Sequence, residues 1–227
     1  MPLYSFKSAA ASFGAFALCA LLSCPAAAIE TTSVPALARE LKIGDVVFTR
    51  IDAKPFREVA KATGSWTNHV GIVLDVSGDE PVIGESKFPL SGTTTLARFV
   101  ARSDGGRVAV LRLGTDLTPP QQAALRAAAE RRAGIFYDTG FDIASVHRQF
   151  CSRYVREVVI EATGTPLGEV ESFSKLLTRQ PDVKLGFWKL WYFGNIPWER
   201  RTVTPASVMQ SPALRPVFDG VATAPAD

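Results

Sequence analysis

The sequence lacks a strong excess of charge, a second long apolar run, and any linker or repeat that would divide it. Lysine and arginine number 25 against 22 aspartate and glutamate residues, so the formal net charge is only +3. A surplus this small and scattered argues against a nucleic-acid partner. Without a Gly/Ser-rich linker or a low-complexity tract, residues 29–227 are expected to form a single domain with an aromatic-rich C-terminal extension.

The one long apolar run lies at the N-terminus and resembles an export signal. Lys7 is the only charge in this region, an apolar run from Ala9 to Leu22 follows, and Ala26-Ala27-Ala28 offers a cleavage site. We therefore expect residues 1–28 to be a signal peptide and the protein to be exported to the periplasm or cell envelope. The mature chain would begin at Ile29.

A lipoprotein signal is the alternative for the same segment. Residues 1–23 would then be removed and Cys24 would carry a lipid anchor, although Leu22 and Pro25 make the match to a processing site imperfect. The apolar run is shorter than the roughly 20 residues that span a bilayer, and no later stretch is as long. We therefore expect no transmembrane span in the mature chain.

Cysteine is also scarce, with three residues in the whole chain. Cys19 and Cys24 would leave with a signal peptide cleaved before Ile29, so Cys151 would be the only thiol. Exported proteins ordinarily pair their cysteines in disulfides, and an unpaired one is most often catalytic. The alternative is a small buried residue, because free cysteine is among the most buried residue types.

Cys151 opens a segment with the apolar spacing of a helix. Val155, Val158, Val159 and Ala162 follow the i, i+3, i+4, i+7 pattern of a buried stripe. Cys151 is therefore expected in the first turn, where the helix dipole and unpaired N–H groups lower the pKa of a thiol. The thiolate is the species that attacks a carbonyl carbon.

The rest of the chain indicates an α+β fold with a small antiparallel sheet packed against helices. A helix of residues 118–132 is expected from the capping pattern at Thr118 and the proline that follows. Strands are expected at residues 43–51, 68–76, 81–85 and 107–113, and further helices at 55–62, around 96–100, and from 151 to about 164.

A thiol nucleophile requires a base, and the sequence offers only two histidines. His69 lies on a predicted strand and shares a face with Gly71, which is expected to leave open space beside the imidazole. His147 precedes Cys151 by four residues and would lie one turn away if the helix extended back that far. We favour His69, because a strand opposite a helix N-terminus can present a ring across a cleft.

A third polar group must orient the imidazole. Glu85 stands at the end of the predicted strand that follows the His69 strand, where its carboxylate would accept the other ring N–H. Asp75 and Asp138 are weaker candidates for the same role. The alternative for Glu85 is an exposed acid at a strand end.

Aromatic residues gather near the C-terminus, and they support two interpretations. They would either line a substrate groove or form a loop packed on the core, and core packing is favoured because glycine and proline lie nearby. The cluster consists of Phe187, Trp188, Trp191, Tyr192, Phe193 and Trp198.

Five motifs in order resemble the permuted papain-fold amidases of the NlpC/P60 superfamily, the YiiX/YaeF/YebB-like group. They cover roughly residues 41 to 165 and are Gly44-Asp45-Val46-Val47-Phe48, Asn68-His69-Val70-Gly71-Ile72-Val73, Val82-Ile83-Gly84-Glu85, Tyr137-Asp138 and Phe150-Cys151-Ser152-Arg153-Tyr154-Val155.

The resemblance implies a circularly permuted papain-like fold with Cys151 as nucleophile, His69 as base and Glu85 as orienting acid. It also implies that Tyr137 lies near the substrate site, and we expect Trp66 to contact substrate as well. The order His, acid, Cys is reversed relative to ordinary papain-like enzymes, which permutation allows because it moves the termini without moving packed elements. No metal or cofactor is required.

The sequence thus predicts an exported cysteine amidase or peptidase that forms an acyl-enzyme on Cys151. A small peptide or a peptidoglycan stem peptide is the expected substrate. A thioesterase or acyltransferase acting on lipid-like acyl groups is the alternative, with Trp188, Trp191 and Phe193 lining an acyl pocket. A third interpretation is a non-catalytic binding module that has kept the fold.

Overall fold

The computed structural model describes residues 29–223. The expected signal peptide of residues 1–28, including the candidate lipid-anchor residue Cys24, lies outside the described residues. Within the described part, no helix has the length and apolar character needed to span a membrane.

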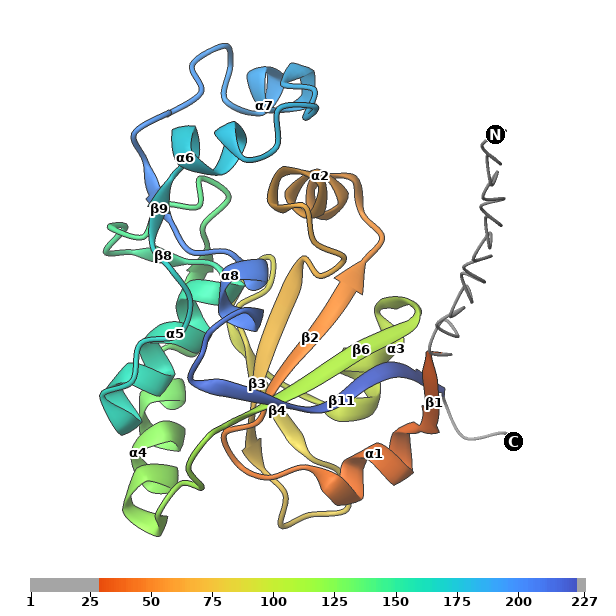
Figure 1. Cartoon of the computed structure of the whole chain (residues 1–227). Coiled ribbons are helices and arrows are strands. Elements are labelled where there is room, and N and C mark those ends of the chain that lie inside the picture. Colours follow the sequence, from red (N-terminus) through yellow and green to blue (C-terminus); the bar gives the residue numbers. More distant parts are fainter. Residues whose placement is uncertain (1–28, 224–227) are drawn as a thin grey trace, which may run out of the picture.

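The fold is organised around a seven-stranded sheet whose strands are antiparallel neighbours, except for one parallel pair, β1 and β11 (Figure 1). In order across the sheet, the strands are β1 (Glu30–Ser33), β11 (Leu214–Thr223), β6 (Ser103–Leu113), β2 (Val46–Ile51), β3 (His69–Asp75), β4 (Val82–Glu85) and β5 (Gly92–Thr95). Two short pairs stand apart: β7 (Phe136–Tyr137) with β8 (Arg148–Gln149), and β9 (Glu171–Ser172) with β10 (Arg201–Thr202).

Helices cover both faces of this sheet because its central strands alternate between two apolar cores. On β2, Val46 and Phe48 point to one core and Val47 to the other. The first core is closed by α4 (Pro119–Glu130) and α5 (Cys151–Thr163), and the second by α1 (Val34–Glu40) and α3 (Leu96–Ala101).

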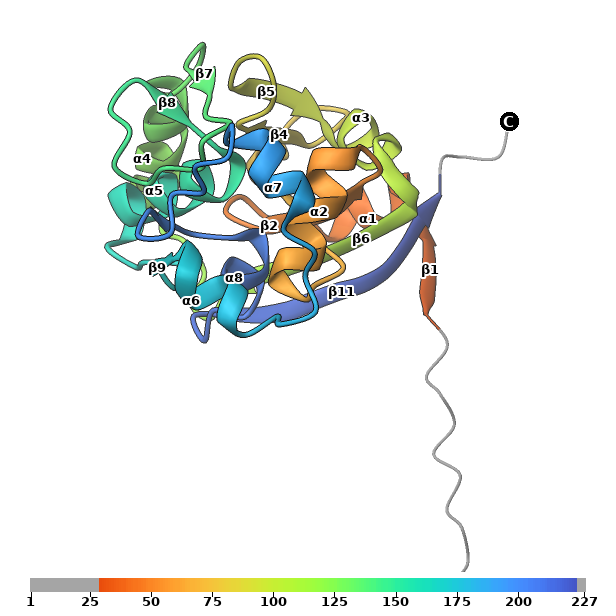
Figure 2. The same cartoon turned by 90° about the horizontal axis from the view of Figure 1, so that it is seen from above.

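A third apolar cluster lies outside these two cores. It joins α2 (Lys54–Thr63), α6 (Phe173–Thr178) and α7 (Gly186–Trp191), and both views place α7 beside α2 (Figure 2). The remaining helix, α8 (Pro205–Met209), contacts α5. The C-terminal aromatic residue Trp188 is buried in the third cluster, whereas Phe193 is 92% exposed.

The α+β fold class is confirmed, but the sheet is larger than the small one expected. The sequence patterns did not indicate β1, β5 or β11. Residues 214–223 belong to this sheet, because β11 lies between β1 and β6. The pairing register between β11 and β6 shifts between Pro216 and Phe218, so inward and outward side chains do not alternate regularly along β11. This irregularity hides the two-residue hydrophobic period by which a strand is predicted from sequence.

Helix α5 follows the sequence prediction closely. Its buried stripe includes Val155, Val158, Val159 and Ala162, and it ends at Gly164, whose φ of 74° is left-handed. The stripe packs against β3. This packing holds the N-terminus of α5, and with it Cys151, near the start of β3.

Candidate active site

Two polar residues meet at one end of the sheet because β3 and β4 are antiparallel neighbours. His69 is the first residue of β3 and Glu85 is the last residue of β4, so both lie at the same end of the two strands. Nε2 of His69 stands 2.7 Å from Oε2 of Glu85, and both side chains are buried. The expectation that Glu85 adjoins His69 therefore agrees with the geometry, and Glu85 is not an exposed strand-end acid.

Glu85 is held ionised by a second, basic partner. Nη2 of Arg102 donates to Oε1 of Glu85 at 2.7 Å, and Nζ of Lys87 lies 3.6 Å from the same oxygen. Burial opposes ionisation, but the hydrogen bond and charge of His69, together with Arg102, lower the pKa of Glu85 to about 2. The carboxylate is therefore a fixed negative charge beneath the imidazole.

The His69 ring is fixed by two phenyl groups. Phe99 lies 5.4 Å from it between ring centroids, and Phe56 meets it edge-on at 6.0 Å. The sequence led us to expect open space beside Gly71. Neighbouring side chains fill that space instead. A Cβ at Gly71 would lie 2.7 Å from Cγ2 of Ile83 and 2.9 Å from Cε2 of Phe99.

Cys151 occupies the first turn of α5 and is buried. The N-cap residue, Phe150, offers no side-chain acceptor to the N–H groups of this turn. Burial raises the pKa of a thiol, yet the interaction with the nearby imidazole of His69 outweighs it and lowers the pKa of Cys151.

The two ring nitrogens of His69 have different partners. Nε2 is engaged by Glu85, and Nδ1 has no close hydrogen-bond partner among residues 29–223, so it remains for the thiol of Cys151. Burial lowers the pKa of the imidazole, but the interactions with Cys151 and Glu85 raise it to about 9. These opposed shifts favour a thiolate–imidazolium pair.

Tyr137 lies close to the same sulfur. Burial and the charge of Cys151 raise the pKa of its phenol well above the usual range, so the hydroxyl keeps its proton. The interaction of this phenol with Cys151 also helps to lower the pKa of the thiol. Tyr137 is therefore a donor beside the candidate nucleophile.

The competing residues are not brought to the site. His147 is exposed, and α5 begins only at Cys151, so the two residues are not one helical turn apart. Asp138 accepts from the backbone N–H groups of Gly140 and Asp142 at 2.8 and 2.9 Å, and this keeps it in its own loop. Asp75 likewise accepts from the residues that follow it in the turn after β3.

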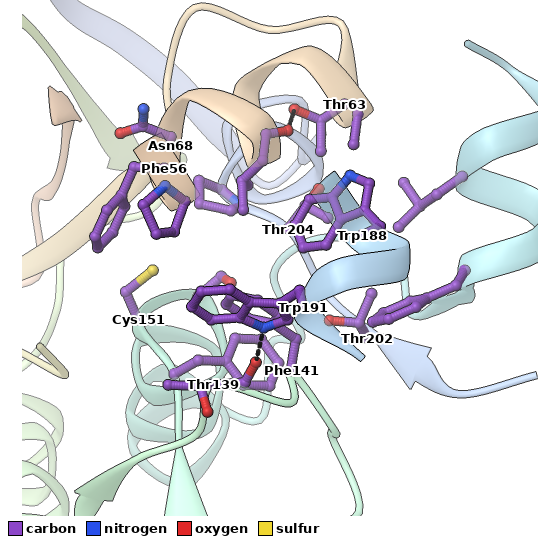
Figure 3. A pocket seen from close by; sticks show the side chains of 18 of the residues that line it. Phe56, Thr63, Asn68, Thr139, Phe141, Cys151, Trp188, Trp191, Thr202 and Thr204 are labelled. Carbon is purple, nitrogen blue, oxygen red and sulfur yellow. Dashed lines mark hydrogen bonds between the residues drawn. The ribbon is translucent and has the colours of Figure 1, made fainter. Parts of the chain in front are cut away.

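A cavity of about 230 Å³ adjoins Cys151. In Figure 3 the sulfur points into the space between Phe56 and Trp191. The lining residues come mainly from α2, α6, α7 and the loops around 139 and 203, and include Phe56, Val59, Tyr137, Phe141, Cys151, Leu176, Leu177, Trp188 and Trp191.

Trp66 does not line this cavity. Its ring lies under the guanidinium of Arg107, with 4.1 Å between Cζ and the ring centroid, and it packs against the first apolar core. The structure therefore gives Trp66 a packing position instead of the substrate contact expected for it. Among the C-terminal aromatics, Trp188, Trp191 and Tyr192 line the cavity and Phe193 does not.

Sequence reasoning missed Arg102, Phe99 and Phe56 as parts of the site. Arg102 follows α3 and both phenyl groups come from helices outside the matched motifs. Their positions depend on how helices pack over the ends of distant strands. The apolar positions of Leu96, Phe99 and Val100 indicated a buried helical face, but not that this face would meet His69.

A cysteine at a helix N-terminus, facing a histidine and a carboxylate at the end of an antiparallel sheet, is the arrangement of papain-like cysteine hydrolases. Here the histidine and the acid precede the cysteine in the chain, so the order is permuted. The chain belongs to the permuted papain-like amidase family YaeF/YiiX, also called C92, whose model matches residues 40–218. This is a family of cysteine amidases and peptidases.

Two comparisons with Escherichia coli proteins agree with this assignment. The "Uncharacterized protein YiiX" of strain K12 is 30% identical over 185 residues, which cover 82% of this chain and 90% of the relative. The crystal structure of YiiX from strain O157:H7 superimposes with a TM-score of 0.70 at 27% identity, over 80% of this chain and 99% of that one.

The YiiX of strain O157:H7 is described as a metalloprotein. Between residues 29 and 223 of the present chain, no group of three or more His, Cys, Asp and Glu side chains is placed to hold a metal ion. His69, the buried one of the two histidines, has its Nε2 engaged by Glu85. The residues of the site therefore do not fit a resident metal.

Proposed function

We propose that the protein hydrolyses an amide bond through an acyl-enzyme on Cys151, with His69 as base and Glu85 as the group that orients it. The observation that supports this most is the position of His69. Its Nε2 is fixed by a buried carboxylate at 2.7 Å, which leaves Nδ1 for the thiol at the start of α5. That is the orientation that a thiol nucleophile needs.

The first half of the reaction forms a thioester. The Cys151 thiolate attacks the carbonyl carbon, and a C–S bond forms as the carbonyl oxygen becomes negative. The backbone N–H of Cys151 and the hydroxyl of Tyr137 are the donors available to stabilise this oxygen. When the intermediate collapses, the C–N bond breaks and the leaving amine takes the proton held on His69.

The second half returns the enzyme to its starting state. His69, now neutral, removes a proton from water, and the hydroxide attacks the thioester carbonyl. The C–S bond breaks, a carboxylic acid is released, and Cys151 leaves as the thiolate beside the imidazolium. Glu85 stabilises the imidazolium in both halves and keeps the ring from rotating.

The compartment and the substrate are further parts of the proposal. Residues 1–28 have the charge, apolar run and Ala-rich end of an export signal, which supports a site of action in the periplasm or cell envelope. A small peptide, including a peptidoglycan stem peptide, is an amide substrate available in that compartment.

A thioesterase or acyltransferase acting on apolar acyl groups is the second candidate function. The cavity beside Cys151 favours this candidate, because the walls of the cavity are apolar.

The decisive experiment traps the acyl-enzyme. Incubation with p-nitrophenyl acetate followed by intact-mass measurement should show one acetyl group on the wild-type protein, mapped to Cys151. Cys151→Ala should abolish the adduct and His69→Ala should slow its formation by at least about a hundredfold, which is the scale of general-base catalysis. An adduct that persists in Cys151→Ala, or forms equally fast in His69→Ala, would overturn the proposal and leave a binding module as the better interpretation.

A further inference from the structure

Three short segments lie side by side at the surface and form a small ribbon. β7 pairs with β8, with Phe136 opposite Arg148, and Leu90 forms a bridge to Phe136 from the segment between β4 and β5. In Figure 2, β7 and β8 lie at one edge of the molecule and β11 lies at the opposite edge. Because paired residues of neighbouring strands point to the same side, Leu90, Phe136 and Arg148 share one face of the ribbon.

The two faces of this ribbon have an inverted polarity. The inner residues Ser91, Tyr137 and Gln149 are polar and buried, and Nε2 of Gln149 donates to Oγ of Ser91 at 2.9 Å. On the outer face, Leu90 and Phe136 are 38% and 58% exposed. A sheet with one solvated face ordinarily turns its apolar residues inward and its polar residues outward. The inversion indicates that the outer face meets an apolar surface.

Two further apolar side chains extend the outer face. Val146 lies two residues before Arg148 and is 83% exposed, and Phe88 lies two residues before Leu90 and is 73% exposed. Single apolar residues are common on protein surfaces, whereas two phenylalanines, a leucine and a valine gathered on adjacent segments form a patch that needs an explanation. We call this surface the ribbon face; it consists of Phe88, Leu90, Phe136, Val146 and Arg148.

A hollow rich in arginine adjoins the ribbon face. Its volume is about 300 Å³, and Val146 and Arg148 belong to both. The charged residues that line it leave an excess of two positive charges; they are Arg131, Arg132, Arg148, Arg153, Glu157 and Glu161. The two glutamates pair with three of the arginines, whereas Arg148 lies over the ring of Phe136, with 5.9 Å between Cζ and the ring centroid. The charge of Arg148 is therefore available to an external anion.

The combination of apolar and cationic groups distinguishes between partners. A second copy of this chain, docked through the same face about a twofold axis, would bring the two arginine hollows together, and like charges in contact oppose association. A bilayer with anionic phospholipids complements both parts of the surface. Its phosphates attract guanidinium groups, and its acyl region takes up phenyl and aliphatic side chains. The proposed export brings the chain to such a bilayer.

We propose that the ribbon face docks the protein onto bilayers that contain anionic phospholipids. Phe88, Phe136 and Val146 enter the interface, and Arg148 contacts a headgroup phosphate. The inference goes beyond amide hydrolysis and does not depend on it. The inner side of β7 carries Tyr137, whose phenol interacts with Cys151. Docking therefore holds the candidate active site next to the membrane surface.

Sedimentation with vesicles tests the docking. The chain that begins at Ile29 is used, because it contains every described element and lacks Cys24, the candidate lipid-anchor residue. Binding to vesicles of phosphatidylcholine and phosphatidylglycerol should be at least about tenfold tighter than binding to phosphatidylcholine alone, since each basic residue near an anionic surface contributes roughly a factor of five. Added salt should weaken it. Equal binding to both vesicles, or binding to neither, would overturn the proposal.

Two pairs of matched variants locate the contact. Val146→Ser should weaken binding to the anionic vesicles by about fivefold or more, because a valine that enters the interface loses its contact with water. Val76→Ser is its control, since Val76 is also exposed but follows the opposite end of β3 from His69. Arg148→Glu should weaken binding by about tenfold or more, and Arg215→Glu makes the same change of charge on β11. Equal losses in a variant and its control, or no loss in Val146→Ser and Arg148→Glu, would contradict the assignment.

Hydrogen exchange of the wild-type protein gives an independent answer. Anionic vesicles should slow exchange in peptides from residues 86–91 and 134–149 and leave peptides from β11 unchanged. Cys151→Ala should show the same protection, because docking breaks no bond. Protection confined to other elements would place the contact elsewhere and overturn the proposal. A dimer in solution that protects residues 134–149 without vesicles would assign the ribbon face to a second copy instead.

Discussion

His69 is the residue whose ionisation controls the site, because its pKa and that of Cys151 are shifted in opposite directions. The imidazole pKa is raised to about 9 and the thiol pKa is lowered, so the reactive pair exists between the two values. Below that range the thiol is protonated. Above about pH 9 the imidazolium loses the proton that the leaving amine needs.

Alkylation of Cys151 by iodoacetamide tests this pair without a substrate. Wild-type protein should react at pH values well below the ordinary thiol pKa of about 8.5. In His69→Ala the thiol keeps its burial and loses its partner, so the rate at pH 7 should fall by more than about tenfold. His147→Ala is the control and should behave as wild type. Slow labelling that neither histidine affects would make Cys151 a structural residue.

Glu85→Gln should alter both the pH profile and the stability. Loss of the carboxylate removes one cause of the raised His69 pKa, so the alkaline limb of kcat/KM should move from near pH 9 to lower pH. The lowered pKa of Glu85, about 2, means that its stabilising contribution is complete above the ordinary value of about 4.5 and is lost as pH falls towards 2.

Urea unfolding at several pH values measures the second effect. The difference in unfolding free energy between wild type and Glu85→Gln should be on the order of 3 kcal/mol at pH 6 and shrink below pH 4. His69 acts in the opposite direction, because its contribution is present below about pH 6.5 and lost as pH rises through 9. A difference independent of pH would show that Glu85 stabilises only by packing.

At the residue scale, the sequence identified the three polar groups that the structure brings together, because their residue types are rare or stand at strand and helix ends. It did not identify Arg102 as the second partner of Glu85. That ion pair joins residues seventeen positions apart across α3 and β4, and no local pattern encodes it. Arginine at the end of a short helix is ordinarily an exposed residue.

At the scale of single elements, β3 and α3 position the imidazole together through Gly71. Phe99 on α3 can approach His69 closely because Gly71 has no side chain. The strand alternation predicted correctly that Val70, Ile72 and Leu74 share a core face and that Val73 faces the other way. Alternation shows which face of the sheet a side chain points to, but not which residue of another element it contacts. It therefore could not predict that a ring from α3 fills the space over Gly71.

Gly71→Ala tests this arrangement. The new methyl group would press on Phe99 and Ile83, and overpacking of this kind costs about 1–3 kcal/mol. Because Phe99 also contacts His69, kcat/KM should fall more than stability alone explains, in protein that circular dichroism shows to be folded. Gly78→Ala is the control, since nothing lies within 4 Å of a Cβ there. Full activity in Gly71→Ala would mean that Phe99 does not position the ring.

The start of α5 shows a second limit of reading elements from sequence. Its apolar stripe locates the helix, but the sequence does not show whether the residues just before Cys151 belong to the helix or to a loop. Residues 148–149 form β8, paired with β7, so the helix begins only at Cys151. His147 is excluded from the site by that short strand, which has too few residues to leave a periodic signal.

For the whole molecule, the main difference from expectation is the C-terminal strand. The chain returns after the aromatic segment to insert β11 between β1 and β6, and β6 is in turn the neighbour of β2. Pairing between strands about a hundred residues apart is set by the completed sheet, so it could not be deduced from local patterns. The family match, which extends to residue 218, includes half of this strand.

Mass spectrometry of the mature protein, which identifies its first residue, tests the proposed export of the chain. Protein expressed from the full sequence in a Gram-negative host should begin at Ile29, as cleavage after Ala26-Ala27-Ala28 requires. A first residue at Cys24 bearing acyl chains would establish the lipoprotein alternative. Retention of Met1 on cytoplasmic protein would refute export.

The placement of the tryptophans gives the molecule a built-in optical reporter. Of the four in the sequence, Trp188 and Trp191 line the cavity beside Cys151, whereas Trp66 is covered by Arg107 and Trp198 is 41% exposed. Fluorescence emission from the cavity pair therefore changes when a ligand displaces solvent there. Occupancy can be followed in Cys151→Ala protein, in which no bond is broken, and so separated from every step of the chemistry.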